Sequence, residues 1–226
     1  MAKIQIPKKF DSEYFAELDA RLRERFGTPA AKSCPDPTGA LIRGILSQNT
    51  NDTNRDRAYG NLVREFPTWD EVLAAPKEKI AALVRPAGMM SQRAARIKKL
   101  LRWLAEHNGG VPDASFLLKM PHTEAVKLLT SVDGIGLKTA AVFLLFCGGA
   151  PLFPVDTHIR RIMTRLGAFP PRTPPDRMIM PLSEIIPPEL HMSLHLNLLN
   201  LGRQICTARK PHCEICPVAD MCEKKL

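Results

Sequence analysis

The stretch VDGIGLKTA, residues 132–140, decides how the centre of this chain folds. It follows the end of one apolar helical pattern and precedes AVFLLFC, the apolar body of another. Gly134 and Gly136 supply a turn between the two helices that can take positive φ. The sequence therefore predicts a helix-hairpin-helix, whose backbone N–H groups at the start of the second helix bind a phosphate without reading any base.

Lys138 falls in the first turn of that second helix. The helix dipole and partial burial both disfavour an ammonium group there. A neutral amine is a nucleophile, whereas an arbitrary lysine is usually a solvated surface side chain. The hairpin that precedes Lys138 favours its interpretation as a nucleophile.

Asp156 is a second candidate for chemistry, in the segment PLFPVDTHIRR. It immediately precedes a helical pattern, so it is a helix N-cap by position. A capping carboxylate uses one oxygen and can direct the other into a cleft, so the structural and the catalytic role are compatible.

Four of the six cysteines lie within the last 21 residues, in the pattern Cys-x6-Cys-x2-Cys-x5-Cys. They are Cys206, Cys213, Cys216 and Cys222. In a reducing compartment this cluster predicts a metal site, although four thiolates suit either zinc or an iron–sulfur cube. Cys34 and Cys147 stand alone and are interpreted as small buried hydrophobes with no role.

Apolar residues recur at three and four positions along the chain, which predicts an all-α fold. Helices are expected at residues 11–26, 38–48, 53–65, 69–75, 77–83, 91–106, 115–119, 123–130 and 137–147. After residue 148 the texture changes to a proline-rich stretch, where turns should separate short helices. We place a domain boundary there.

Composition points to an anionic partner. The net charge of +9 makes nucleic acid the first candidate. The N-terminal segment MAKIQIPKKFDSEYF lacks the apolar core of a signal peptide, and the longest apolar run is too short to cross a bilayer. A cytoplasmic protein with no membrane role is expected.

The hairpin with Lys138, the PVDTH segment with Asp156, and the terminal cysteines occur together in one order and spacing. In this the chain resembles the endonuclease III family of DNA glycosylases, within the helix-hairpin-helix-Gly/Pro-Asp superfamily. The resemblance implies a two-domain helical fold. A six-helix domain with the hairpin would span residues 30–148, and a 4Fe–4S cluster domain would combine residues 1–29 and 149–226, with a DNA cleft between them.

The resemblance also implies an activity, the removal of oxidised pyrimidines from double-stranded DNA in base excision repair. Lys138 would attack C1′ of the damaged nucleotide, expel the base, form a Schiff base and cleave the strand by β-elimination. Asp156 would stay ionised and stabilise the developing positive charge or help to move the lysine's proton. The four cysteines would hold a 4Fe–4S cluster, in a monomer associated with the nucleoid.

A base that leaves the stack must be replaced by side chains. By family register, Gln48 or Asn49 is the polar residue that enters the gap. Met89 is the apolar wedge, although a methionine is more often core filler. Arg209 and Lys210 either bind a phosphate near the cluster or form a solvated basic turn. The basic face of residues 91–106 is likewise either a phosphate contact or solvated; it comprises Arg96, Lys98, Lys99 and Arg102.

The chain departs from the family pattern at several positions. Val132 and Asp133 replace the usual Leu-Pro, Leu137 replaces a basic residue, and Met89 replaces a leucine. Two other functions fit part of the sequence. A monofunctional adenine or mismatch glycosylase would not need Lys138, and a non-catalytic DNA-binding module would not need Asp156.

Overall fold

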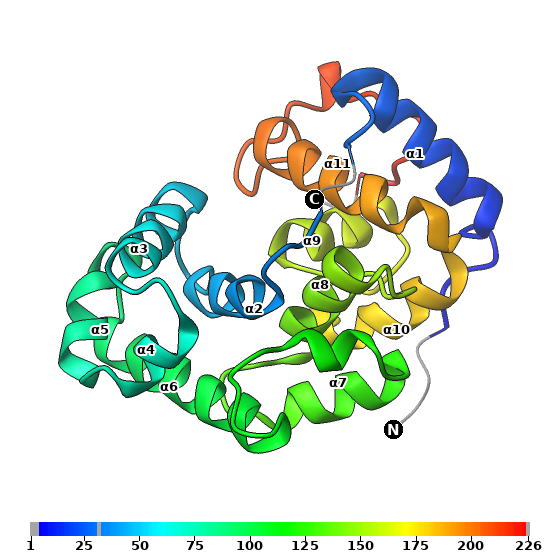
Figure 1. The fold of residues 1–226 in the computed structure, drawn as a ribbon. Helices are drawn as coiled ribbons and strands as arrows, with labels where there is room; N and C mark the ends of the chain where they lie inside the picture. Colours follow the sequence, from blue (N-terminus) through cyan, green and yellow to red (C-terminus); the bar gives the residue numbers. More distant parts are fainter. Residues whose placement is uncertain (1–4, 31–32, 225–226) are drawn as a thin grey trace. The chain divides into compact units, whose positions relative to one another are not determined.

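The computed structural model describes residues 5–30 and 33–224, and the secondary structure of this part of the chain is helical throughout. The prediction of an all-α fold is confirmed. The chain divides into two compact units, Met1–Lys32 with Gly149–Leu226, and Ser33–Gly148 (Figure 1). Residues 1–4 of the N-terminal segment MAKIQIPKKFDSEYF, which lacks the apolar core of a signal peptide, lie outside the described part. No helix among the described residues has the length and apolar character needed to cross a membrane.

The first unit contains one helix from the N-terminus and three from the C-terminal half. They are α1 (Ser12–Phe26), α9 (Thr157–Leu166), α10 (Pro175–Ile185) and α11 (His191–Gln204). Two single turns, η3 (Pro188–Leu190) and η4 (Cys213–Ile215), follow α10 and α11. α11 packs on both α1 and α9. Its Ser193 hydroxyl donates to the buried Asp19 carboxylate of α1 at 2.7 Å, which fastens the two ends of the chain together.

The second unit, expected to hold six helices, contains the seven from α2 to α8. They are α2 (Pro37–Leu46), α3 (Asp52–Glu65), α4 (Trp69–Ala74), α5 (Lys77–Leu83), α6 (Met90–His107), α7 (His122–Ser131) and α8 (Leu137–Gly148). The single turns η1 (Arg85–Ala87) and η2 (Ser115–Leu118) separate some of them. The segment 115–119, expected to be a helix, is therefore only one 3-10 turn. Most of the other helix ends lie within one residue of their expected positions, while α2 ends two residues before its expected end.

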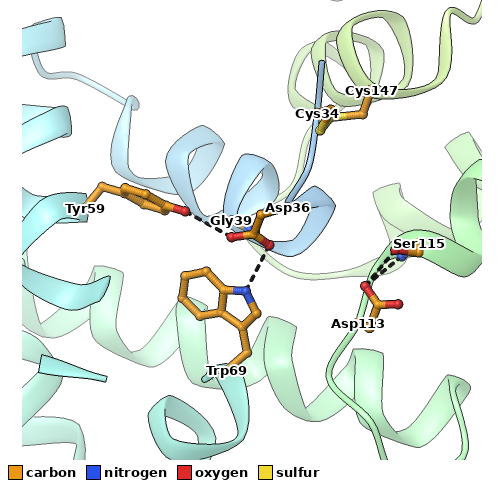
Figure 2. The surroundings of a disulfide bond; sticks show 8 residues. All are labelled: Cys34, Asp36, Gly39, Tyr59, Trp69, Asp113, Ser115 and Cys147. Carbon is orange, nitrogen blue, oxygen red and sulfur yellow. Dashed lines mark hydrogen bonds between the residues drawn. A yellow bond between two sulfur atoms is a disulfide. The ribbon is translucent and has the colours of Figure 1, made fainter. Parts of the chain in front are cut away.

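α2 and α8 form an antiparallel pair at the centre of this unit. Gly44 allows the close approach, because a Cβ there would lie 2.9 Å from the Thr139 methyl group. At one end of the pair a disulfide joins Cys34 to Cys147 (Figure 2). Our interpretation of these cysteines as isolated hydrophobes was wrong, because packing α2 against α8 brings together two residues that are 113 positions apart.

Asp36 fixes the beginning of α2 (Figure 2). Its carboxylate accepts the backbone N–H of Gly39 at 2.8 Å, the Tyr59 hydroxyl at 3.1 Å and the Trp69 indole N–H at 3.0 Å. Burial, and then the charge of Asp36, raise the pKa of Tyr59, so the phenol remains a donor. One N-cap thus ties α2 to both α3 and α4.

Candidate functional site

The predicted hairpin is present between α7 and α8. The N–H of Ile135 donates to the Val132 carbonyl at 3.0 Å, and Gly134 lies at φ 90°, as the third residue of a type II turn requires. Gly136 lies outside the left-handed region, so only one of the two glycines uses positive φ. A Cβ at Gly136 would meet no atom within 4 Å. The backbone before α8 is therefore open to a ligand.

Lys138 is the second residue of α8 and is half-buried. The neighbouring Thr139 is buried against α2, which fixes the register of this turn. The free N–H groups and the dipole at the helix start favour an anion, and they disfavour a cation at the same place. The open backbone at Gly136 and the side chain of Lys138 therefore lie within one turn of each other at this helix end.

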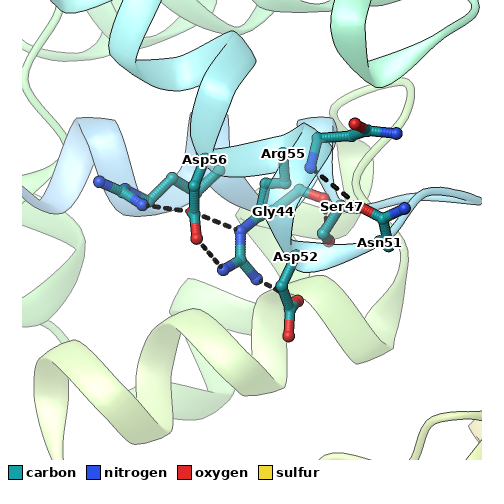
Figure 3. Close-up of polar contacts among 8 residues, drawn as sticks. Gly44, Ser47, Asn51, Asp52, Arg55 and Asp56 are labelled. Carbon is teal, nitrogen blue, oxygen red and sulfur yellow. Dashed lines mark hydrogen bonds and ion pairs between the residues drawn. The ribbon is translucent and has the colours of Figure 1, made fainter.

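The loop between α2 and α3, residues 47–51, is fixed at both ends (Figure 3). The Ser47 hydroxyl donates to the Gly44 carbonyl at 2.8 Å, and the Asn51 side chain caps α3 by accepting the N–H of Asn54 at 2.8 Å. Between them, Asn49 adopts φ 52° and is exposed. Its side chain is exposed, and hydrogen bonds of Ser47 and Asn51 hold the loop on either side of it.

Gln48 is used differently from Asn49. Its amide nitrogen donates to the carbonyl of Gly134 at 2.8 Å, and its amide oxygen accepts from Arg96 at 2.8 Å. Gln48 therefore links the loop between α2 and α3 to the hairpin through side-chain hydrogen bonds, and we call this contact a brace. Asn49 is left as the polar side chain at the tip of the loop.

Met89 lies at the start of α6, with φ 45° and 50% of its surface exposed. The core-filler alternative for Met89 is wrong. Gly88, with φ 76°, completes the turn into the helix. A flexible apolar side chain thus projects from a second constrained backbone position.

The basic face of α6 is largely occupied by contacts within the protein. Arg96 donates to Gln48, Lys98 donates to the carbonyl of Ala75, and Lys99 lies 3.4 Å from the carboxylate of Asp133. The first two contacts fix loops rather than leave the cations solvated. Asp133, one of the departures from the family pattern, is 67% exposed beside the hairpin and is partly neutralised by Lys99.

Sequence reasoning missed Arg93, although the chain contains a signal for it. Arg93 stands four residues before Ile97, in register with the apolar stripe of α6, and it is only 2% exposed. An arginine at a core position of an amphipathic helix needs internal partners. Its partners are the backbone carbonyls of Gln48, in the loop between α2 and α3, of Ala87 and Gly88, before Met89, and of Ile45 in α2.

Asp156 caps α9, as expected. Its Oδ1 accepts the N–H of Ile159 at 2.8 Å, and the side chain is half-buried. The segment before it is fixed as well, because the N–H of Phe153 donates to Ser183 at 2.7 Å and the Nδ1 of His195 lies 3.0 Å from the Pro154 carbonyl. Lys138 belongs to one unit and Asp156 to the other.

The four C-terminal cysteines line one pocket together with Arg165. No group of three or more His, Cys, Asp or Glu residues in the described part of the chain is arranged to hold one metal ion. Zinc needs its four thiolates about 2.3 Å from one centre. In a 4Fe–4S cube each thiolate binds a different iron, so the sulfur atoms stay further apart. The four thiols that line this pocket are the donor set that a 4Fe–4S cube needs.

The cysteine pocket disfavours free thiolates at two of its four cysteines. Burial and the neighbouring cysteines raise the pKa of the Cys216 and Cys222 thiols, so thiolates here need a positive centre. Arg165 donates to the Cys206 sulfur at 3.2 Å. Arg209 and Lys210 are exposed in the first cysteine loop, as both of their proposed roles require.

Comparisons with known proteins match two parts of the chain to families. Residues 42–188 match the HhH-GPD superfamily of base excision DNA repair proteins, and residues 206–222 match the iron–sulfur binding domain of endonuclease III. The second match begins at Cys206 and ends at Cys222, the first and last residues of the cysteine pattern.

Relatives align along most of their length. Endonuclease III of Thermotoga maritima is 34% identical over 92% of this chain and 91% of the relative. Endonuclease III of Escherichia coli (strain K12) is 31% identical over 92% of this chain and 94% of its own.

Two solved structures match the fold with a TM-score of 0.80 and 25% identity over 94% of this chain. One is a non-covalent endonuclease III–DNA complex, of which 95% is covered, and the other is a trapped endonuclease III–DNA covalent intermediate, of which 96% is covered.

Proposed function

The chain belongs to the endonuclease III family of the HhH-GPD superfamily, and from this premise we propose that it removes oxidised pyrimidines from double-stranded DNA, with Lys138 as the nucleophile. The family fixes the reaction class: the protein is a DNA glycosylase and abasic-site lyase that carries a 4Fe–4S cluster. The choice of lesion and the roles of individual residues are the proposal. The observation that carries it is the half-buried Lys138 at the second position of α8, directly after the hairpin.

The Nζ of Lys138 would attack C1′ of the extruded nucleotide. The bond from C1′ to the base breaks, and its electron pair leaves with the base. Opening of the sugar then gives a Schiff base between Nζ and C1′. Loss of a C2′ proton eliminates the 3′ phosphate, and water releases the enzyme. The position of Lys138 in the first turn of α8, directly after the hairpin, supports this role.

Asp156 would remain ionised throughout the reaction. Its Oδ1 already caps α9, so the second oxygen is the one that can face positive charge developing on the sugar. A carboxylate with one oxygen fixed by a backbone N–H has little freedom to rotate. We propose this preorganisation as its contribution to base removal.

The protein would bind DNA through its phosphate backbone, and two side chains would hold the duplex open at the damaged base. The open backbone at Gly136, preceded by the Gly134 turn, would bind a phosphate. Asn49 and Met89, both exposed on constrained loops, would occupy the space left by the extruded base. Gln48 would brace the hairpin rather than enter the gap.

Cys206, Cys213, Cys216 and Cys222 would hold the cluster. The cluster supplies a structural crosslink for a C-terminal segment with little apolar surface of its own. Arg209 and Lys210 would then contact a phosphate from the first cysteine loop. The net charge of +9 supports binding to DNA, and we propose that the protein acts as a monomer in the cytoplasm, at the nucleoid.

The test compares four duplexes that differ only in one base pair. They carry an oxidised pyrimidine, an oxidised purine, a mismatched adenine or an abasic site. We expect single-turnover release of the oxidised pyrimidine with strand cleavage, and strand cleavage at the abasic site. Release of the mismatched adenine without strand cleavage would instead support the monofunctional alternative.

A further inference from the structure

Arg93 connects the two loops that carry Asn49 and Met89. We call residues 47–51 the Asn49 loop and residues 84–89 the Met89 loop. We propose that Arg93 is a positioning residue that couples these loops, so that Asn49 and Met89 enter DNA as one rigid pair. This inference rests on the proposed function.

The guanidinium group donates to both loops at once. Its Nε donates to the Gly88 carbonyl at 2.8 Å, and one terminal nitrogen donates to the Ala87 carbonyl at 3.1 Å. The other contacts reach the carbonyls of Ile45, at the end of α2, and Gln48. Four carbonyls from two separate segments therefore share one side chain.

Two of these carbonyls belong to the peptide groups that directly precede the loop tips. The Gln48 carbonyl precedes Asn49, and the Gly88 carbonyl precedes Met89. Asn49 and Met89 are both non-glycine residues with positive φ, at 52° and 45°. Such conformations persist only where surrounding contacts hold them. Arg93 makes that contact at both tips.

The position of Arg93 is costly for stability alone. Burial, and then the charge of Arg96, lower the pKa of the Arg93 guanidinium. Its guanidinium group donates to four neutral backbone carbonyls. Among the described residues, no carboxylate accepts a hydrogen bond from it. A buried cation of this kind is favourable only when its donors are satisfied. The planar fork of five N–H groups is the feature that satisfies several carbonyls together.

The coupling extends to the hairpin. The Gln48 backbone accepts from Arg93, while its side chain donates to Gly134. Disturbing Arg93 should therefore loosen both loop tips together. A substitution at Arg93 should slow the extrusion of a base from a paired duplex more than it slows the reaction at a sugar that is already exposed.

Arg93→Lys is the variant of choice, because it keeps the charge and loses the fork geometry. Lys98→Met is the matched control. Lys98 lies on the same helix and also donates to a loop carbonyl, that of Ala75, outside both loops.

Amide hydrogen exchange without DNA tests the coupling directly. We expect faster exchange at residues 46–49 and 87–90 together in Arg93→Lys, and in neither segment in Lys98→Met. Unchanged exchange in Arg93→Lys, or a change in only one segment, would overturn the inference. This measurement does not depend on catalytic activity.

Single-turnover kinetics test the functional consequence. For Arg93→Lys we expect the single-turnover rate of base release to fall on the order of 10- to 100-fold with an oxidised pyrimidine in a paired duplex. A misplaced group lowers reaction rates by about this factor. Strand cleavage at an abasic site in a single-stranded oligonucleotide should change little. Equal losses on both substrates would overturn the positioning role. Failure of the unmutated protein on both substrates would instead contradict the proposed function, and the exchange result would still decide the coupling.

Discussion

Two kinds of local setting hold the candidate functional residues. Asp156 caps α9 and Lys138 occupies the first turn of α8, whereas Asn49 and Met89 have positive φ, in the loop between α2 and α3 and directly before α6. Capping and catalysis are compatible for Asp156, because a carboxylate has two oxygens. At Met89 the left-handed backbone opposes local preference, which is typical of functional positions, whereas asparagine adopts positive φ more readily than most residues.

Asp156→Asn separates the two roles of this residue. Asparagine caps a helix about as well as aspartate, so the unfolding free energy should change by less than about 0.5 kcal/mol. Loss of the charge should slow base removal on the order of 100-fold or more. Single-turnover release of the damaged base measures this rate.

Asp11→Asn is the matched control, since Asp11 caps α1 in the same unit by accepting the N–H of Tyr14 at 2.9 Å. Its base-removal rate should equal that of the unmutated protein. An unchanged rate in Asp156→Asn would remove Asp156 from the mechanism.

At the scale of elements, the hairpin is a constrained turn followed by an open helix start. Only Gly134 needs glycine for its conformation, since it lies at φ 90° and a Cβ there would lie 2.6 Å from the Arg96 side chain. Gly136 has ordinary φ and open space around it. Gly134 is therefore required by the turn itself, whereas the role proposed for Gly136 is to let a phosphate approach the backbone.

Gly134→Ala should lower the unfolding free energy by about 1–2 kcal/mol, because an L-residue is strained in the left-handed region. Gly136→Ala should leave stability nearly unchanged, while its methyl group obstructs a phosphate and weakens binding to an undamaged duplex. Denaturant unfolding and binding titrations of the two variants measure both effects. Equal affinity for DNA in Gly136→Ala and the unmutated protein would argue against a phosphate at this turn.

The hairpin and most helices could be predicted from the sequence because apolar spacing, prolines and glycines act locally. The brace from Gln48 to Gly134 could not, since it joins loops 86 residues apart. Arg93 was hidden for a related reason. A single arginine in the register of an apolar stripe signals burial, but only the packed loops reveal the carbonyls it contacts.

For the whole molecule, the chain enters the Ser33–Gly148 unit beside Cys34 and leaves it beside Cys147. The disulfide thus closes nearly the whole unit into one loop. Such a link reduces the entropy of the unfolded chain most when the closed loop is long. This pairing could not be predicted from the sequence, because the two cysteines meet only when α2 and α8 pack.

We expect the oxidised protein to exceed Cys34→Ser/Cys147→Ser in unfolding free energy by up to about 4–5 kcal/mol, the chain-entropy value for a loop of this length. A mild reductant that leaves the cluster intact should abolish the difference. Denaturant unfolding with and without reductant measures it. Equal stability of the oxidised protein and the double variant would show that the link does not form in solution or does not constrain the unfolded chain.

The central claim, that Lys138 is the nucleophile, is tested most directly by borohydride trapping on a duplex with one abasic site. Reduction converts a Schiff base into a stable covalent adduct. The account predicts an adduct for the unmutated protein and for Lys127→Ala, a lysine variant on the preceding helix, and none for Lys138→Ala. Lys138→Ala should keep most of its DNA affinity, because phosphate contacts supply most of it. An adduct of equal yield with Lys138→Ala would contradict the claim.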